Sequence, residues 1–438
     1  MSQKRINWNL FERIKGDEVV WTIVLILILM SVVCNFSSSS RLLVGELTRL
    51  DIVWKQLKVV ALGLGVILVL YNVKDISFFR KVSPWLFPFS VFLLILLLSK
   101  IDLGFIKSAE YNGARRVLEI KGLQVHVFEI VKVSMVLYLA WAQDALRKGE
   151  LKGPAEIKWQ KVMYLYAPFL IIFVMVLTGS NTAALFIGAI MFFSLLLGGG
   201  NFKDLLLVAV MGIITVMICF GLFSATKHSE HVMFQRIGTA IGRLFDPVDW
   251  EQKVVDSRTG SVDYYEALDE IRQPFGAKIA VKEGGLLGKG PGQSTQRYAV
   301  PDMSEDYMFS FILEEYGLLG GILVICLYVS LLARGALIAK NCGDDEYAKL
   351  VIAGLCLMIT GQAFLHMFVN ADIGPMTGQT LPLISHGNSA FLCFCAAFGI
   401  ILSISRIAEK RMEQEQEKAE ALTGEYDDIA EEAAEYDN

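Results

Sequence analysis

Residues 19–36 read VVWTIVLILILMSVVCNF, an apolar run without a charged side chain. A soluble helix cannot use such a run because its outward face would be apolar, whereas about 20 apolar residues span the ~30 Å hydrocarbon core of a bilayer. Similar runs recur along the 438-residue chain, which is 54% hydrophobic and 19% charged, with a mean hydropathy of +0.50. This composition excludes a soluble enzyme, a collagenous chain and a disordered chain, and solid runs exclude a β-barrel. The sequence predicts an all-α polytopic membrane protein.

Ten apolar runs predict membrane-spanning helices, at 19–36, 57–73, 84–99, 127–145, 162–178, 181–198, 204–223, 308–337, 349–368 and 389–406. The first run follows several basic residues and lacks a small-residue cleavage site, so we expect a retained anchor with a cytoplasmic N-terminus. An even number of spans returns the C-terminus to the cytoplasm. Most basic loop residues then fall on the inner side, as the positive-inside rule requires.

One predicted outer loop breaks this charge pattern. The segment 100–122 contains Lys100, Lys107, Arg115, Arg116 and Lys121. Either the orientation is wrong at this loop, or basic side chains are kept outside for a purpose. Three other loops and both termini favour the second interpretation, so we expect Arg115 and Arg116 to face outward and to contact substrate phosphate.

Two hydrophilic segments stand apart from the predicted membrane domain, 19–406. The cytoplasmic ends are a short N-terminal segment, 1–18, and an acidic tail, 407–438, whose nearly single-signed charge predicts disorder or a frayed helix. The connection 224–307 between the seventh and eighth spans is the longest loop, and we expect it to be extracytoplasmic.

Aromatic residues and two apolar-periodic pieces, 231–245 and 262–281, predict short ordered helices within that long loop. The cysteines lie mostly in or beside apolar runs, so neither a disulfide framework nor a zinc site is expected.

The glycine-rich segment that starts at Gly284 is the first of three candidate sites. Its backbone N–H groups can hold an anionic group, and Ser294 and Gln296 add uncharged hydrogen-bonding groups. Asp306 follows just before the eighth span. The alternative is a solvated loop with a helix cap, since acidic residues favour the start of a helix.

Glu314 and Glu315 lie inside the eighth span. A carboxylate at membrane depth costs roughly 2.5–3.5 kcal/mol on insertion scales, so such groups are normally paired or functional. Glu314 follows Asp306 by eight residues, about two turns, so both can share one helical face. The alternative is that the membrane begins only at Leu318, which leaves both carboxylates at the interface.

Glu129 and Lys132 in the fourth span form the second candidate site. Their i, i+3 spacing makes them neighbours on one helical face, where they can pair. The structural alternative is a self-neutralising pair. The functional interpretation is a lysine offered to phosphate and oriented by Glu129, with Arg115 and Arg116 nearby, since arginine forks suit phosphate oxygens.

The third candidate site is GQAFLHMFVNADIGPMTGQTLPLISHGNS, residues 361–389. Prolines, glycines and hydroxyl residues between the last two spans cannot form a regular helix. Irregular backbone at membrane depth occurs only where it is buried in protein or lines a wet cavity, so we predict a re-entrant loop. We expect His366 and His386 to be hydrogen-bonded structural residues rather than metal ligands.

These stretches resemble the SEDS family (shape, elongation, division and sporulation), bacterial ten-helix membrane proteins that polymerise peptidoglycan strands from lipid II. The family pattern GARRW…QPSE…K resembles Gly113–Lys132. The pattern GxGxGxSxQ…LPE.HTDFIF…EELGLLG resembles Gly288–Gly320, with Asp306 at the aspartate of TDF. The pattern GQAF…N…P.TG..LPFIS.GGSS resembles Gly361–Ala390.

The resemblance implies an inverting, lipid-linked peptidoglycan glycosyltransferase in the bacterial cytoplasmic membrane. It implies that Asp306 is the catalytic base or holds a divalent cation, Mg or Mn. The implied substrate-binding residues are Arg115, Arg116, Glu129, Lys132, Ser294, Gln296, Glu314, Asn370 and Ser385. The implied partners are lipid II, a class B penicillin-binding protein transpeptidase and other division proteins, and we expect no nucleic acid.

Within the family, the start KGDEVVW at residues 15–21 and the acidic tail look more like the division branch than the rod-elongation branch. The division branch implies septal cell-wall synthesis. A rod-elongation polymerase, a transporter that flips lipid II and a scaffold for the transpeptidase are the alternatives. Candidate charges near the outer end favour the enzyme over the transporter, and a scaffold gives the buried carboxylates no purpose.

Overall fold

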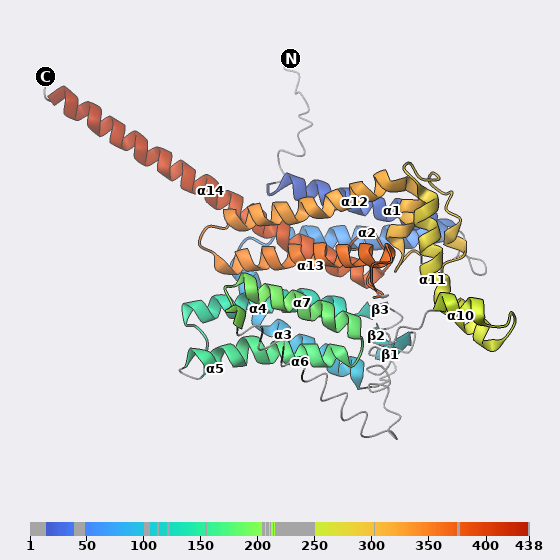
Figure 1. Cartoon of the computed structure of the whole chain (residues 1–438). Coiled ribbons are helices and arrows are strands. Elements are labelled where there is room, and N and C mark those ends of the chain that lie inside the picture. The colour runs from blue at the N-terminus through green and yellow to red at the C-terminus, as the bar shows by residue number, and fades with distance from the viewer. Residues whose placement is uncertain are drawn as a thin grey trace, which may run out of the picture.

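The structure is a computed structural model that describes residues 15–38, 49–99, 106–111, 114–120, 123–153, 156–203, 250–301, 303–374 and 377–436, with four positions between 206 and 214. Long helices run side by side (Figure 1). A small sheet and two helices of the 250–284 segment lie together at one end of these helices. The projecting part of the last helix lies at the other end.

The long helices are α1 (Glu18–Ser38), α2 (Arg49–Tyr71), α3 (Ile76–Leu98), α4 (Val127–Lys148), α6 (Ala167–Leu177), α7 (Asn181–Leu197), α12 (Met308–Asn341), α13 (Glu346–Asn370) and α14 (Asn388–Tyr436). The shorter ones are α5 (Ile157–Lys161), the π-helix η3 (Val162–Tyr166), α10 (Trp250–Asp256), α11 (Val262–Gly284) and the 3₁₀ turn η4 (Gln296–Tyr298). Each predicted span except 204–223 overlaps one of these helices. The span 204–223 lies almost entirely outside the described residues, as does the predicted piece 231–245.

The multi-pass helical architecture predicted from the sequence is confirmed. Within the described residues, seven helices are long and apolar enough to cross a membrane, and α7 is a shorter apolar helix. The helix α4 is not among the seven, and it carries charges at Glu129, Lys132 and Asp144. The number of spans and the orientation of the termini stay predictions.

Helix α3 begins earlier than its predicted start at residue 84. Asp75 caps the helix through a hydrogen bond from the Ser77 N–H at 3.0 Å. Pro84 and Pro88 then lie inside the helix rather than at its start.

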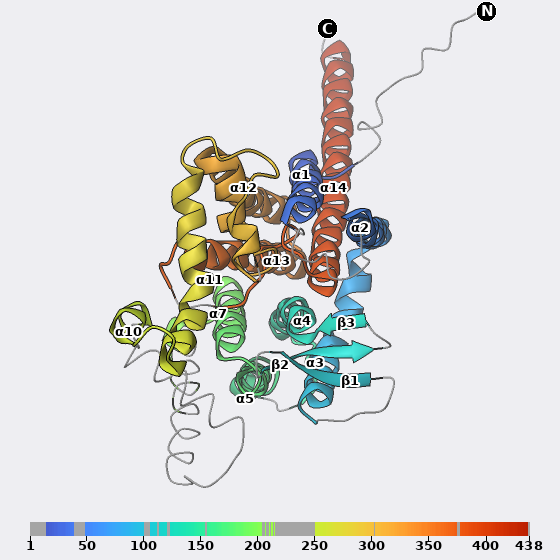
Figure 2. The same cartoon turned by 90° about the vertical axis from the view of Figure 1, so that its right-hand side faces the viewer.

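A three-stranded antiparallel sheet occupies part of the predicted outer loop 100–122, which is a departure from an all-α fold. The strands β1 (Ile106–Tyr111), β2 (Ala114–Ile120) and β3 (Leu123–His126) pair in sequence order. Figure 2 looks at the molecule from this end and shows the strands beside the start of α4, with α11 across from them. Strand β3 runs directly into α4, so the sheet fixes where that helix starts.

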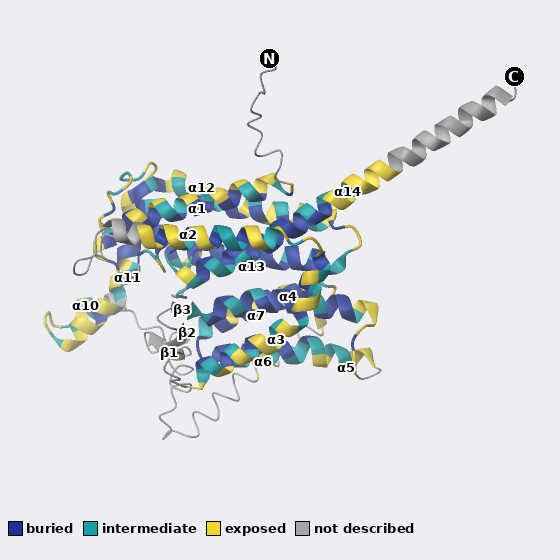
Figure 3. Ribbon diagram, turned by 180° about the vertical axis from the view of Figure 1, so that it is seen from behind, coloured by how far each residue is buried: buried dark blue, intermediate teal, exposed yellow. Residues whose placement is uncertain are grey.

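Helices α13 and α14 form the centre of the bundle. Their most apolar windows are 72% and 78% buried, whereas those of α2 and α3 are each 22% buried. Figure 3 shows buried residues between the helices and exposed ones on the outer faces. The exposed faces of α2 and α3 therefore suit contact with lipid.

Of the two alternatives predicted for the acidic tail, disorder or a frayed helix, the structure shows a helix. Helix α14 continues to Tyr436, well beyond the predicted end of the last span at residue 406. The segment is rich in Glu and Ala, which have high helix propensity, and it continues an existing helix without a new nucleation step.

Candidate functional site

Asp306 lies half-buried in the turn that leads into α12. Three hydrogen bonds from the end of α13 and the segment after it hold the backbone of this turn. The Asn370 Nδ2 group donates to the Asp306 carbonyl at 3.0 Å, and the Ser385 hydroxyl donates to the Glu305 carbonyl at 2.7 Å. The His386 N–H donates to the Ser304 carbonyl at 2.8 Å. The first and third candidate sites therefore meet at residues 304–306, which we call the Asp306 turn.

Asn370 and Ser385 lie beneath the Asp306 turn with both ends of their side chains engaged. The Asn370 Oδ1 atom accepts the Ser310 N–H at 2.9 Å, and the Ser385 oxygen accepts the Leu381 N–H at 2.9 Å. Asn370 is 2% exposed and Ser385 5% exposed. These two residues position the turn, and direct substrate binding by either of them stays a prediction.

A small pocket opens beside the Asp306 turn, lined by Asp306, Tyr307, His366, Val369, Thr377, Gly378 and Gln379. His366 is buried, and its Nε2 atom accepts the Phe309 N–H at 3.2 Å. Its Nδ1 atom lies 2.7 Å from the Gln379 carbonyl oxygen and donates to it. His366 is thus a hydrogen-bonded structural histidine in one tautomer, as expected from the sequence.

The segment 377–387 is irregular and folds back into the bundle, as a re-entrant loop would. Leu383 adopts a left-handed conformation (φ 62°) and is 2% exposed. The Tyr328 hydroxyl donates to the Pro382 carbonyl at 2.5 Å, and the Asn35 Nδ2 group donates to the Ile384 carbonyl at 3.0 Å. Side chains of α1 and α12 thus satisfy buried backbone carbonyls that helical bonds would otherwise occupy.

Glu129 and Lys132 pair inside the bundle. The Lys132 Nζ atom lies 2.6 Å from Glu129 Oε1, 2.6 Å from Gln362 Oε1 and 2.9 Å from Gln379 Oε1. Lys132 is 1% exposed, so a lysine ammonium with three donors has three acceptors and almost no contact with solvent. The predicted pairing is present. All three N–H groups of Lys132 have protein acceptors in this arrangement, so none is left to donate to the predicted phosphate.

Gln379 connects the buried lysine to the Asp306 pocket. Its side chain accepts from Lys132, its carbonyl accepts from His366, and it lines the pocket with Asp306. The Gln362 Nε2 group also donates to the Thr380 carbonyl at 3.0 Å, which fixes the neighbouring residue. The second and third candidate sites therefore form one hydrogen-bonded unit.

Glu314 and Glu315 instead hold the glycine-rich segment. Both are fully buried. The Glu314 carboxylate accepts from the Ser294 hydroxyl at 2.5 Å and from the Thr295 N–H at 2.8 Å. Glu315 Oε1 accepts the Gly292 N–H at 3.0 Å. The segment meets carboxylates of its own chain, so the predicted anion cradle is occupied at these N–H groups.

The remaining groups of this cluster include two cations and one further predicted residue. Gln296 donates its backbone N–H to Glu314 at 3.3 Å, and Arg297 lies 3.9 Å from Glu315. Lys289 Nζ lies 2.7 Å from Glu314 Oε1. Partial desolvation lowers the pKa of Lys289, but hydrogen bonds to Glu283 and Glu314 outweigh it and raise that pKa above its ordinary value. Lys289 is therefore charged and neutralises part of the buried acidic pair.

Helix α12 is interrupted at Gly317, where the backbone has φ 66° and ψ −169°. The segment 285–290 enters the break: the Lys289 N–H donates to the Glu314 carbonyl at 2.8 Å, and the Leu318 N–H donates to the Gly285 carbonyl at 2.9 Å. A Cβ atom at Gly317 would lie 2.4 Å from the Gly288 nitrogen. Only glycine fits, and the loop supplies the hydrogen bonds that the helix loses at the break.

Arg115 and Arg116 lie on β2, whose backbone pairs Arg115 with Glu110 of β1. Their side chains are outside the described residues. The end of β3, the next strand of the sheet, contacts the bundle where the His126 N–H donates to the Ser389 hydroxyl at 2.9 Å. Ser389 lies in the first turn of α14, three residues after His386, so the sheet is anchored at the same end of the bundle as the Asp306 turn.

The described residues contain no group of three or more His, Cys, Asp or Glu side chains that could hold a metal ion. Asp306 is a single carboxylate on the pocket wall. Mg²⁺ is usually bound by one or two carboxylates together with substrate phosphates rather than by an all-protein cage. One aspartate therefore fits an ion that arrives with a pyrophosphate, and it does not make a resident metal centre.

Sequence reasoning missed Gln362, Gln379, Lys289 and Arg297 as members of these clusters. Gln362 lies within the GQAF motif, and Gln379 lies elsewhere in the third candidate site. Both were therefore in a segment that the sequence singled out, but nothing in the sequence indicated what either residue does. The two glutamine partners of Lys132 have no spacing signal, because they lie 230 and 247 residues later in the chain.

The fold and the pocket define a polytopic helical membrane protein with a half-buried carboxylate near one end of the bundle. Residues 17–410 match the family described as "FTSW_RODA_SPOVE: Cell cycle protein", and the chain belongs to that family. The resemblance to SEDS proteins is thereby confirmed.

Two curated relatives and one solved structure illustrate the match. The probable peptidoglycan glycosyltransferase FtsW of Saccharophagus degradans is 27% identical over 355 residues, which cover 80% of this chain and 82% of that protein. Stage V sporulation protein E of Bacillus subtilis is 26% identical over 346 residues, or 78% and 84% of the two chains. A chain solved in work on the "Structural coordination of polymerization and crosslinking by a peptidoglycan synthase complex" has a TM-score of 0.60 at 21% identity, covering 90% of this chain and 98% of that one. This last likeness concerns the fold.

Proposed function

We propose that this protein is a peptidoglycan glycosyltransferase that polymerises lipid II into glycan strands during septal cell-wall synthesis. The observation that carries the proposal is the Asp306 turn, whose half-buried carboxylate borders a pocket while three donors hold its backbone. A rigid, partly hydrated carboxylate near the membrane surface suits sugars that are anchored there by their lipids. Names of curated relatives support the same activity.

In the proposed reaction, Asp306 acts as a general base on the 4-hydroxyl of the acceptor GlcNAc. The hydroxyl oxygen attacks the anomeric carbon of the donor, the bond to undecaprenyl pyrophosphate breaks, and the proton goes to the Asp306 carboxylate. Attack opposite the leaving group inverts the anomeric centre. A positioned base typically contributes 10²–10⁴-fold to the rate.

The leaving pyrophosphate needs positive charge. We assign this role to Arg115 and Arg116, whose guanidinium forks suit phosphate oxygens. In the alternative role of Asp306, its carboxylate and the pyrophosphate would hold a divalent cation, Mg or Mn, that would neutralise the leaving group. Lys132 is saturated by side chains of the bundle, so its proposed role is to hold Gln379 and thereby the pocket wall.

We place the protein in the bacterial cytoplasmic membrane with the Asp306 end outside. Cysteines substituted at Arg115 and Arg116 should then react with an impermeant thiol reagent added to intact spheroplasts. Labelling that occurs only after permeabilisation would contradict this orientation.

We further propose that a class B penicillin-binding protein transpeptidase is the partner that cross-links the new strand, together with other division proteins. A solved structural neighbour is described as a complex that coordinates polymerisation and crosslinking, which supports a partner of this kind. The particular partner is to be identified by co-purification.

The direct test uses purified protein and lipid II, with and without the transpeptidase, and measures glycan polymer on gels. Polymer formation supports the enzyme. Movement of fluorescent lipid II across a vesicle bilayer without polymer would favour a flippase. Complementation of a rod-elongation mutant, but not of a division mutant, would assign the protein to the elongation branch.

A further inference from the structure

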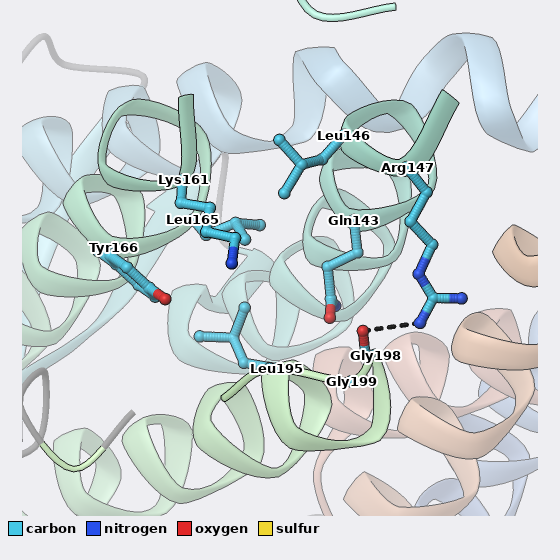
Figure 4. Close-up of a pocket in the computed structure, with 10 residues that line it drawn as sticks. Gln143, Leu146, Arg147, Lys161, Leu165, Tyr166, Leu195, Gly198 and Gly199 are labelled. Carbon is cyan, nitrogen blue, oxygen red and sulfur yellow. Dashed lines mark hydrogen bonds between the residues drawn. The ribbon is translucent and has the colours of Figure 1, made fainter. Parts of the chain in front are cut away.

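A second pocket lies at the opposite end of the bundle from Asp306. It has a volume of about 180 Å³ and lies between the last turn of α4, the π-helix η3 and the turn after α7. One water molecule needs roughly 10–15 Å³ by the same measure, so the space admits a larger group. Figure 4 shows polar side chains directed toward this space, Gln143 from α4 and Lys161 and Tyr166 from the continuous helix formed by α5 and η3.

Gln143 contributes a buried acceptor to the pocket. The residue is 4% exposed, and its Nε2 group donates to the Leu139 and Ser194 carbonyls at 3.1 and 3.2 Å. Among the described residues, nothing donates to its Oε1 atom. A Cβ atom at Gly198 would lie 1.5 Å from Oε1, so the glycine is what makes room for this amide.

The two cations of the pocket have different surroundings. Arg147 donates from Nη2 to the Gly198 carbonyl at 2.8 Å and from Nη1 to Glu346, so its charge is largely used. Lys161 is half-buried and makes no ion pair within the described part of the chain. No carboxylate lines the pocket among these residues. The pocket therefore presents one uncompensated ammonium group, which favours an anion.

The π-helix η3 explains how Lys161 and Tyr166 reach the same space. The two residues are five apart, and at 3.6 residues per turn they would point about 140° away from each other on an α-helix. The wider π turn of Val162–Tyr166 brings them to one side, and both line the pocket. Single π turns are rare and occur frequently at functional sites.

The surface beside the pocket suits lipid chains. Ile157, Trp159 and Met163 are 64%, 59% and 54% exposed, on the same helical element as Lys161. Exposed Trp and Lys residues next to apolar ones are typical of the membrane–water interface. A ligand with a charged head and apolar chains matches this arrangement better than a wholly soluble anion.

We propose that this pocket binds the headgroup of an anionic membrane phospholipid. Lys161 pairs with the phosphodiester, Gln143 Oε1 accepts a hydrogen bond from a headgroup hydroxyl, and the acyl chains lie along the exposed face of residues 157–163. Both headgroups contain an anionic phosphodiester. Glycerol adds hydroxyl donors and leaves a net negative charge, whereas choline adds no hydroxyl donor and its quaternary ammonium cancels the charge of the phosphate. The site is independent of the proposed chemistry at Asp306.

The test is native mass spectrometry of the purified full-length protein with phosphatidylglycerol or phosphatidylcholine added at equal concentration. Wild type should retain phosphatidylglycerol preferentially. Lys161→Gln should lower this retention by roughly fivefold, since one cation near anionic lipid contributes about that factor. Lys161→Arg should restore it, and Lys158→Gln, at an exposed position outside the pocket, should stay close to wild type.

Two results would overturn the proposal. Equal losses in Lys161→Gln and Lys158→Gln would mean that surface charge alone attracts the lipid. Inorganic phosphate in a separate arm distinguishes the source of the anion: protection from heat by free phosphate, in protein that does not prefer phosphatidylglycerol, would assign the pocket to a soluble anion. Thermal unfolding of every variant in the absence of added lipid identifies any that fail to fold. If Lys161→Gln does not fold, lipid retention is compared between wild type, Lys161→Arg and Lys158→Gln.

Discussion

Asp306 and Glu314 are two turns apart at the start of α12, and the structure surrounds them differently. Asp306 is half-buried beside a pocket, and buried groups hold its backbone. Glu314 is fully buried, and hydrogen bonds from the glycine-rich segment hold its carboxylate itself. Hydrogen bonds to its main chain position Asp306, whereas the side chain of Glu314 is itself the hydrogen-bond acceptor.

This difference distinguishes a catalytic role for Asp306 from a structural role for Glu314. A general base needs an oxygen that a substrate proton can reach, with the rest of the residue fixed. The surroundings of Asp306 meet that requirement. The Glu314 carboxylate holds the segment that follows the loop inserted at the Gly317 break, so removing this carboxylate should affect folding before it affects chemistry.

The largest loss of activity is expected for Asp306→Asn, which tests the catalytic role assigned to this residue. The amide keeps the size of the side chain but cannot accept the proton, so we expect polymerisation of lipid II to fall by at least ~10². Thermal unfolding and membrane insertion should stay close to wild type, because the hydrogen bonds from Asn370, Ser385 and His386 reach the backbone of the turn. Glu305→Gln, at the neighbouring exposed residue, is the matched control and should retain most activity. Robust polymer from Asp306→Asn would move the search for the base to Glu314 or Glu315.

Lys132→Ala tests whether the buried charge near the Asp306 pocket affects mainly stability, as expected for Glu314, or mainly activity, as expected for Asp306. It leaves Glu129 without its cation and two glutamine oxygens without their donor, so we expect a loss of about 3–5 kcal/mol in unfolding free energy. Activity should fall as well, because Gln379 lines the pocket. Calorimetry in detergent measures the first effect.

The double variant Glu129→Leu/Lys132→Met provides the control for this pair. It removes both charges at once, so it should recover part of the stability lost in Lys132→Ala. A fully active and equally heat-stable Lys132→Ala protein would show that the pairing has no function.

Glu314→Gln should cost less than Lys132→Ala, because the amide oxygen can still accept from Ser294 or Thr295. We expect about 1–3 kcal/mol, from the lost contact of Lys289 and an amide group facing N–H donors. Activity per folded molecule should stay near that of wild type, measured as polymer formed per heat-resistant protein. A large loss of turnover in fully folded protein would contradict the structural role assigned to Glu314.

The apolar runs predicted most of the helices because membrane spans carry their signal in local composition. The Glu129–Lys132 pair was also predictable, since both partners lie on one helix at i, i+3. The Glu314 cluster was not, because its donors lie about 20 residues earlier and no spacing encodes a loop that enters a broken helix. The sheet was missed for a related reason: β1 and β2 pair through backbone groups, and their sequences, IKSAEY and ARRVLEI, are short and rich in charge.

Asp306 itself was identified by resemblance and not by its surroundings. The sequence places it two residues before a helix, where a capping acid is the ordinary expectation. What distinguishes it is the contact of its turn with Asn370 and Ser385, which lie more than sixty residues later in the chain.

The smallest effect we predict compares two buried serines, one from each region. The Ser385 hydroxyl donates to the Glu305 carbonyl and accepts the Leu381 N–H, and the Ser294 hydroxyl donates to Glu314 and accepts the Arg297 N–H. Each alanine variant therefore loses two hydrogen bonds, each worth about 0.5–1.5 kcal/mol or somewhat more beside a charge. The two variants should therefore lose similar stability. Only Ser385→Ala should slow polymerisation, by several-fold in kcat with little change in KM, because it loosens the turn that aims Asp306 and leaves the sugar contacts in place. Equal kcat values for the two alanine variants would mean that the Asp306 turn is rigid without Ser385. Slow turnover in Ser294→Ala would mean that the glycine-rich segment takes part in the reaction.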